Sequence, residues 1–263
     1  GDLRMSRIQQ AFANGKAFIP FLTCGDPDLG TTAALVRTMA EAGADLIELG
    51  IPFSDPTAEG PVIQAANARA LAGGVTTDQI FGMARALRRD VAVPMVFMTY
   101  ANVVFSYGTE RFLAAAAEAG IDGLILPDVP FEEKEEFAPA CRACGLDLIS
   151  LIAPTSEGRI SEIAKAAEGF VYCVSSLGVT GMRSRITTDV GAMVGQVRAS
   201  NPHIPCAVGF GISAPEQAAE MAALSDGVIV GSAIVKLVAR HGREAVPAVR
   251  DFTAAMKRAV SRR

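Results

Sequence analysis

One carboxylate stands in an unusual place in this sequence, because Glu48 lies inside the apolar run Leu-Ile-Glu-Leu-Gly-Ile of residues 46–51. Such a run is typical of a parallel strand covered on both faces, where a carboxylate loses its water. Burial raises the pKa of a carboxyl group towards neutrality, which suits a group that transfers protons. The alternative is a structural acid, hydrogen-bonded inside a barrel. We favour the chemical role.

The loop that follows this run, residues 52–61, favours the same interpretation. Three prolines restrict its backbone, and Ser54, Asp55 and Glu59 give it polar groups that a plain connector does not need. We therefore expect a stiff, acid-bearing loop, which favours the chemical role of Glu48.

The elements that must position these acids alternate regularly along the chain. After a short helix at 6–14, strands are predicted at 18–23, 45–50, 94–99, 123–127, 147–152, 169–174, 205–208 and 227–230. Alanine-rich helices are predicted between them, among others at 31–41, 109–118, 132–144, 156–167 and 214–223. A recurring pattern ends a helix on Gly and enters the next strand through Asp, at Asp45, Asp122 and Asp147, with a weaker copy at Asp226.

Eight such units in about 250 residues predict an α/β fold, a (β/α)8 TIM barrel with a short extra N-terminal helix. An open doubly wound sheet would usually stop at five or six strands. No Pro/Gly/Ser-rich linker or charge block divides the chain, so we expect a single TIM-barrel domain over 1–263. Residues 1–4, which precede Met5, could be a remnant of expression rather than native sequence.

Glycines with small hydroxyl residues follow the last three predicted strands, in the segments 175–181, 209–213 and 231–232. Glycine lets backbone N–H groups approach an anion, and barrels commonly bind phosphate after strands seven and eight. Turn glycines are the alternative, and we favour a phosphate site. Tyr100 and Tyr172 lie at strand ends, where a core role and a substrate role are equally open.

Composition excludes several classes of partner. The net charge is −4 and the basic residues are scattered, so no nucleic acid is expected. No apolar run reaches the roughly 18 residues of a membrane span, and residues 1–10 lack the apolar core of a secretion signal. We therefore expect no membrane contact and a cytoplasmic location.

Cysteine and histidine usage predicts neither a disulfide framework nor a metal site. The five cysteines are an odd number spread over a long chain. Cys141 and Cys144 have redox or metal spacing, but they lie in a predicted helix without a second pair. His203 and His241 fall in apparent loops without partner ligands.

Seven short motifs together resemble the tryptophan synthase alpha chain, from about Arg7 to Ala259. They lie at 20–27, 49–56, 100–102, 128–130, 178–181, 209–213 and 231–236. The resemblance implies a lyase that cleaves indole-3-glycerol phosphate to indole and glyceraldehyde 3-phosphate in tryptophan biosynthesis. It also implies no cofactor in this chain, and a tryptophan synthase beta chain as partner, which carries pyridoxal phosphate, in an alpha2beta2 heterotetramer.

The resemblance also implies roles for single residues. Glu48, Glu59 and Tyr172 match catalytic positions. Phosphate contacts are expected from Gly181, Gly211, Gly231 and Ser232, and the indole pocket from Phe21, Ile63, Tyr100 and Phe210. A mobile lid, with Thr180 and Arg183, is expected over residues 177–188, which have no apolar period, and the loop 52–60 is expected to meet the beta chain.

Glu59 departs from the family's pattern, which has an aspartate thought to hold the indole N–H. The charge is kept, but the side chain is one methylene longer. A non-catalytic chain that binds the phosphate ligand and activates a beta chain is therefore an alternative. A Schiff-base aldolase lacks a lysine on a predicted strand, and a zinc aldolase lacks histidine ligands.

Overall fold

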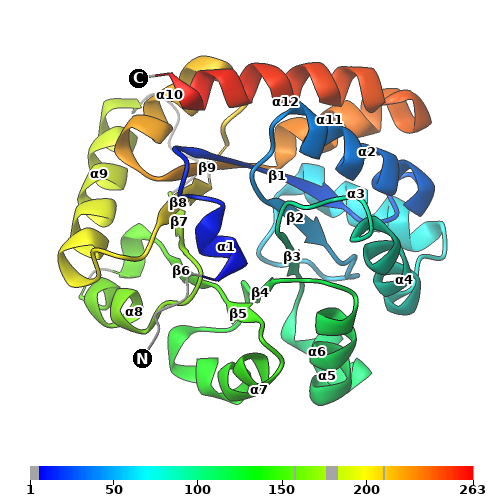
Figure 1. Cartoon of the computed structure of the whole chain (residues 1–263), viewed down its shortest axis with the longest axis horizontal. Coiled ribbons are helices and arrows are strands. Elements are labelled where there is room, and N and C mark those ends of the chain that lie inside the picture. Colours follow the sequence, from blue (N-terminus) through cyan, green and yellow to red (C-terminus); the bar gives the residue numbers. More distant parts are fainter. Residues whose placement is uncertain (1–5, 157, 176–182, 210, 263) are drawn as a thin grey trace.

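Parallel strands occupy the centre of the molecule, and helices surround them (Figure 1). The computed structural model describes residues 6–156, 158–175, 183–209 and 211–262, and only the backbone of 183–188. The strands are β1 (Ala17–Thr23), β2 (Ile47–Gly50), β3 (Met95–Met98), β4 (Gly123–Ile125), β5 (Asp147–Leu148), β6 (Ser150–Ile152), β7 (Val171–Val174), β8 (Cys206–Gly209) and β9 (Gly227–Val230). They pair in the order β5-β4-β3-β2-β1-β9-β8-β7-β6.

The two ends of this order belong to one stretch of chain, residues 147–152, which was predicted as a single strand. β5 pairs with β4 and β6 pairs with β7, and Ile149 between them donates its N–H to Leu124 O at 2.9 Å. The stretch therefore changes partner at Ile149 and closes the sheet. The predicted (β/α)8 barrel is confirmed, with its fifth strand in two pieces.

Helices follow the strands in the expected alternation. They are α1 (Arg7–Gln10), α2 (Leu29–Ala42), α3 (Pro61–Ala72), α4 (Thr77–Leu87), α5 (Ala101–Tyr107), α6 (Thr109–Glu118), α7 (Ala138–Ala143), α8 (Ile160–Ala166), α9 (Arg183–Ser200), α10 (Pro215–Leu224), α11 (Ser232–His241) and α12 (Val246–Ser261). Short 3-10 helices lie at η1 (Phe131–Glu136), η2 (Pro154–Ser156) and η3 (Gly242–Glu244).

Three predicted helices are shorter or broken. The helix expected at 132–144 is divided into η1 and α7, because Pro139 has no N–H to continue the first segment's hydrogen bonds. The helix expected at 156–167 begins only at Ile160, because Gly158 has a φ of +88°. The helix expected at 6–14 ends at Gln10, before Gly15 with its φ of +130°.

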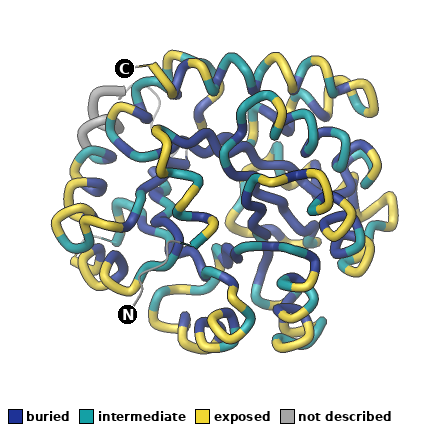
Figure 2. The backbone as a smooth tube through the Cα atoms, in the orientation of Figure 1, coloured by how far each residue is buried: buried dark blue, intermediate teal, exposed yellow. Residues whose placement is uncertain are grey.

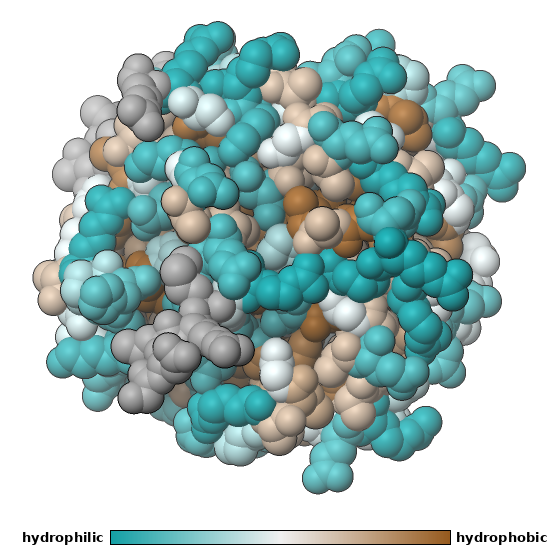
Figure 3. Space-filling view, viewed as in Figure 1, coloured by the Kyte–Doolittle hydropathy of each residue, from teal (hydrophilic) through white to brown (hydrophobic). Residues whose placement is uncertain are grey.

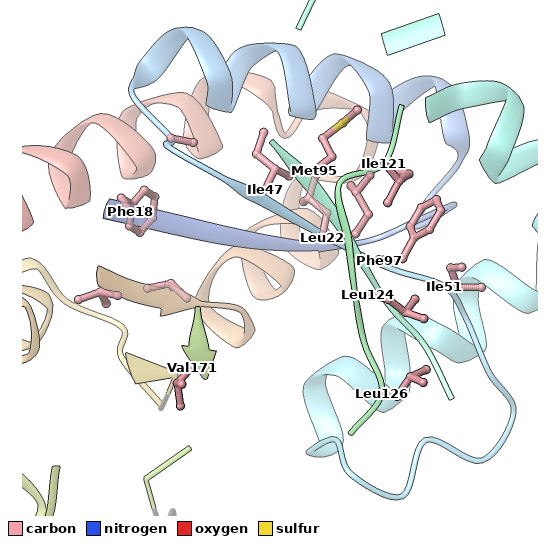
Figure 4. Packing of buried hydrophobic residues seen from close by; sticks show 14 of the residues in the cluster. Phe18, Leu22, Ile47, Ile51, Met95, Phe97, Ile121, Leu124, Leu126 and Val171 are labelled. Atoms are coloured by element: carbon pink, nitrogen blue, oxygen red, sulfur yellow. The ribbon is translucent and has the colours of Figure 1, made fainter. Parts of the chain in front are cut away.

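Apolar side chains form two layers around the strands. Inside the barrel, Ile8 of α1 packs with residues from the strands, among them Ile19, Val96 and Ile149, so α1 fills the interior near the N-terminal strand ends. Outside, strand residues such as Phe97 pack against the helices (Figure 4). Burial is accordingly concentrated in the strands and the inner faces of the helices (Figure 2).

Three of the four aspartates of the recurring pattern tie neighbouring strands together. Asp45 accepts the N–H of Phe18 at 2.8 Å, Asp122 that of Met95 at 3.0 Å and Asp226 that of Cys206 at 2.9 Å. Each also forms an ion pair, with Lys257, Arg88 and Arg198 respectively. The pattern therefore has a structural cause at the N-terminal ends of the strands, away from the predicted site.

The face of the molecule shown in Figure 3 is largely hydrophilic, with smaller apolar areas between the polar side chains. Among the described helices, none combines the length and the apolar character that a membrane crossing requires.

We expect Asp122→Ala to destabilise the protein by about 2–3 kcal/mol, because it removes a hydrogen bond to Met95 and leaves the half-buried Arg88 guanidinium without its ion pair. Urea unfolding measures this. Asp90→Ala is the matched control, because its ion pair with Arg37 is exposed and should contribute less than about 1 kcal/mol. Equal losses in both variants would contradict the role of Asp122.

Candidate active site

Glu48 lies near the C-terminal end of β2, in register with Phe21 of β1. Its side chain is only 1% exposed, and within the described residues its Oε2 atom has no hydrogen-bond partner. Loss of water, together with the nearby charge of Glu59, raises the pKa of Glu48 to about 8. Glu48 therefore holds a proton at neutral pH and can donate it.

The second acid is Glu59, which lies in the loop between β2 and α3 and whose charge acts on Glu48. Burial raises its pKa to about 7, while the hydroxyl of Tyr100 and the amide of Asn67 oppose the rise because they favour the charged form. Glu59 is therefore partly ionised at neutral pH, whereas Glu48 is mainly protonated. Two carboxyl groups with separated pKa values suit different roles in one reaction.

Asn67, on α3, fixes both ends of this loop, and the sequence did not suggest it. Its Oδ1 accepts the N–H of Phe53 at 2.9 Å, and its Nδ2 donates to Glu59 Oε2 at 3.2 Å and to Ile63 O at 2.8 Å. The side chain is 3% exposed. The available signal was an amide on the buried face of an alanine-rich helix, between Ala66 and Ala70.

Tyr172 lies on β7, and the charges of Glu48 and Glu59, after desolvation, raise the pKa of its hydroxyl well above the usual value. It therefore stays protonated and can donate a hydrogen bond. Its ring lies against Gly209 at the end of β8, where an added Cβ would come within 2.3 Å of the ring. Only glycine permits this position of the tyrosine.

The predicted indole pocket is partly described. Phe21 packs with Ile63 of α3, and the end of its ring lies over Gly50, where a Cβ would come within 2.6 Å. The ring of Tyr100 stacks on Phe53 with centroids 5.1 Å apart. Phe210, the fourth predicted member, lies outside the described residues. Phe21 and Ile63 thus share one apolar cluster, whereas Tyr100 lies with Phe53 near Glu59, and a common indole pocket stays a prediction.

The predicted phosphate end adjoins this region. Gly231 precedes α11, and no side chain caps this end of the helix, so the first N–H groups of α11 are available to an anion. A Cβ on Gly231 would lie 3.5 Å from Ile63 and 3.6 Å from Phe21. Ser232 and Gly211 are exposed, and Gly181 and Thr180 lie outside the described residues.

The predicted lid, residues 177–188, is wrong in its second half. α9 begins at Arg183, so 183–188 form its first turns rather than a loop. The reason is the buried series Val190, Met193, Val194 and Val197, whose helical spacing anchors a helix that extends back towards its N-terminus. Residues 177–182 lie outside the described part of the chain, as does the side chain of Arg183.

Two acids at strand ends have structural partners within the chain. Asp26 forms a two-point ion pair with Arg69, at 2.9 and 3.0 Å. Asp128 accepts the N–H of Ala101 at the start of α5. Among the described residues, no three His, Cys, Asp or Glu side chains gather as metal ligands would.

The fold and the site define a class: a (β/α)8-barrel protein with two neighbouring buried acids and an uncapped helix N-terminus after its last strand. The family model described as tryptophan synthase alpha chain matches residues 8–261. The chain belongs to this family.

Individual members of the family match this chain over nearly its whole length. The tryptophan synthase alpha chain of Lacticaseibacillus casei is 48% identical, covering 97% of this chain and 96% of the relative. That of Geobacter sulfurreducens is 49% identical, covering 97% and 99%. A structure of Mycobacterium tuberculosis tryptophan synthase superposes with a TM-score of 0.89 at 36% identity, covering 99% of this chain and 100% of the other.

Asn67→Ala should release the loop, because it removes the acceptor for Phe53 N–H and the donor to Glu59. We expect hydrogen exchange at Phe53 N–H to accelerate by about tenfold or more, measured by NMR. Asn67→Asp keeps the acceptor, so Phe53 should stay protected. Gln64→Ala is the control, because Gln64 contacts only the backbone carbonyl of Glu59. Unchanged exchange in Asn67→Ala would contradict this role.

Proposed function

We propose that this chain is a tryptophan synthase alpha subunit that cleaves indole-3-glycerol phosphate to indole and glyceraldehyde 3-phosphate. The observation that carries the proposal is the buried, protonated carboxyl group of Glu48 beside the partly ionised Glu59. A retro-aldol cleavage needs an acid that can become a base in the next step, which a carboxyl group with a pKa near neutrality provides.

In the proposed mechanism, Glu48 donates its proton to carbon 3 of the indole ring. The resulting Glu48 carboxylate then removes the proton of the hydroxyl on the attached glycerol carbon. The bond between this carbon and indole carbon 3 breaks as the hydroxyl becomes the aldehyde of glyceraldehyde 3-phosphate. The electron pair of the bond returns to the indole ring, and Glu48 ends the cycle protonated.

Glu59 and Tyr172 complete the proposed acid–base centre. The ionised form of Glu59 accepts the indole N–H and stabilises the positive charge that protonation creates on the ring. Asn67 holds that carboxylate at 3.2 Å, while the protonated hydroxyl of Tyr172 faces both acids. Phe21, Ile63 and Tyr100 would hold the apolar ring.

At the other end of the substrate, the phosphate group would lie on the N-terminus of α11 and the glycines before it. Gly231 and Ser232 offer backbone N–H groups there, and Gly211 lies after β8. The short distance between Gly231 and the apolar residues Phe21 and Ile63 supports a single substrate spanning both ends.

Family membership also identifies the partner. Tryptophan synthase alpha chains act with a beta chain in alpha2beta2 complexes; the alpha chain carries no cofactor, and pyridoxal phosphate belongs to the beta chain. We propose the loop 52–60 as part of the contacting face, because Ser54, Asp55 and Thr57 are exposed on it. A cytoplasmic location and a single domain over 1–263 stay predictions.

The second candidate is a chain that binds the phosphate ligand and activates a beta chain without cleaving anything, which Glu59 in place of aspartate would favour. The assay is indole release from indole-3-glycerol phosphate, by the chain alone and with a beta chain. Release above background supports the lyase. Stimulated tryptophan formation from serine and added indole, without release, would support the activator instead.

Glu48→Gln should lower indole release by at least about a hundredfold, because an amide has no acid proton to donate. Relative to the parent, the same variant should become more stable as the pH rises, because the parent loses stability when Glu48 ionises in the unfolded chain but not in the folded one. Because the folded-state pKa of Glu48 is raised, the contribution of Glu48 to the unfolding free energy of the parent is complete below about pH 4.5. This contribution is lost as the pH rises through about 8.

The difference in unfolding free energy between parent and Glu48→Gln should therefore shift in favour of the variant by about 2–4 kcal/mol between pH 5 and pH 8. Urea unfolding at both pH values measures it. Glu41→Gln, at an exposed position, is the control and should show little change. An active Glu48→Gln enzyme, or a shift no larger than that of the control, would contradict the assignment.

We propose that the longer side chain of Glu59 is accommodated, and its hydrogen bond from Asn67 of α3 supports this. Glu59→Asp should therefore draw the carboxylate back and lower the single-turnover cleavage rate by about tenfold to a hundredfold. Glu59→Gln, which removes the charge, should also cleave more slowly than the parent, and Glu59→Asp with Thr57→Leu tests whether the two positions are linked. A faster Glu59→Asp enzyme would contradict accommodation, and a Glu59→Gln enzyme equal to the parent would exclude a charge requirement.

A further inference from the structure

A cavity of about 480 Å³ lies beside η1 and α8, and residues of β5, β6 and the segment after β4 also line it. Its lining includes neither Glu48 nor Tyr172. Most of its wall is apolar, contributed by side chains such as Phe131, Ile152 and Ile163. A cavity of this size could enclose a small organic molecule.

The cavity contains one buried cation. Lys134 is 9% exposed, although the four glutamates that flank it in η1 are all exposed. Its Nζ donates to Ser150 Oγ at 2.8 Å, and within the described residues it forms no ion pair. Glu132, the acid at the rim, is paired with Arg159.

Burying an ammonium group is costly, and burial lowers the pKa of Lys134 although the charges of Glu168 and Glu135 oppose this. An ammonium group has three N–H donors, of which Ser150 satisfies one. The geometry therefore leaves donors for an anion inside an apolar cavity. Nothing in the proposed cleavage uses Lys134.

We propose that this cavity binds a small carboxylate with an apolar body, its carboxylate on Lys134 and Ser150. A single negative charge matches the single ammonium group. A phosphate dianion would bring a second negative charge to the same single ammonium group, since Arg159 is already engaged by Glu132. The apolar body would pack on Phe131, Ile152 and Ile163.

The occupant would also adjoin the catalytic loop without entering the active site. Ala58, which immediately precedes Glu59, and Val174, two residues after Tyr172, both line the cavity. The proposed site is independent of the cleavage reaction and would exist even if the chain cleaved nothing.

The test is isothermal titration calorimetry with 4-phenylbutyrate and, as a neutral counterpart, 4-phenylbutyramide. We expect the carboxylate to bind with a dissociation constant below about 1 mM, and the amide at least about tenfold more weakly. Saturating glycerol 3-phosphate should not displace 4-phenylbutyrate, because glycerol 3-phosphate is expected at the phosphate end of the active site instead.

Lys134→Met should weaken carboxylate binding at least about tenfold, while it keeps the length and apolar character of the side chain. Lys165→Met, at an exposed position on α8, is the matched control and should bind like the parent. Circular dichroism checks the fold of each variant, and Lys134→Gln replaces Lys134→Met if that variant unfolds.

A labelling experiment on the unmodified protein gives a second readout. Acetic anhydride should acetylate Lys134, and 4-phenylbutyrate should slow this at least about threefold without slowing acetylation of Lys165, as mass spectrometry of peptides can resolve. The proposal is overturned by no binding up to about 10 mM, by equal binding of the amide or of Lys134→Met, or by displacement with glycerol 3-phosphate.

Discussion

The removal of water from Glu48 is the interaction on which the site depends. A carboxyl group 1% exposed in a parallel strand, beside a second acid, keeps its proton at neutral pH. This burial lowers the free energy of unfolding at neutral pH, and it gives the barrel an acid that can also act as a base. The neighbouring elements either raise the pKa of Glu48 further or are expected to place the substrate next to Glu48.

Three contacts maintain that environment. Asn67 fixes the loop so that the charge of Glu59 reaches Glu48, and its hydrogen bond limits the rise of the pKa of Glu59. Tyr172 lies close enough to both acids for their charges to raise its pKa, and Gly209 leaves room for its ring. Gly50 leaves room for the ring of Phe21 in the same way. At Gly50 and Gly209, glycine is thus required because a side chain would clash with a neighbouring ring, and not because the backbone adopts an unusual φ angle.

The sequence predicted the barrel because each unit repeats the same local pattern, in which apolar strand, helix and turn signals agree. It also pointed to Glu48, since one acid in an apolar strand is conspicuous. It did not reveal Asn67, whose partners lie 4 to 14 positions away along the chain. The change of strand partner at Ile149 and the burial of Lys134 likewise follow from contacts between distant segments. Local sequence patterns do not predict such contacts.

The most direct test of the account is a titration of the two acids in the parent protein, by carbon-13 NMR of labelled glutamate side chains. Glu48→Gln and Glu59→Gln serve to assign the signals. The account predicts that the carboxyl group of Glu48 titrates near pH 8 and that of Glu59 near pH 7. Because the charge of Glu59 contributes to the raised pKa of Glu48, Glu59→Gln should also lower the midpoint of Glu48. Titration of both groups near pH 4.5 would contradict the central claim, since Glu48 would then have no proton to donate at neutral pH.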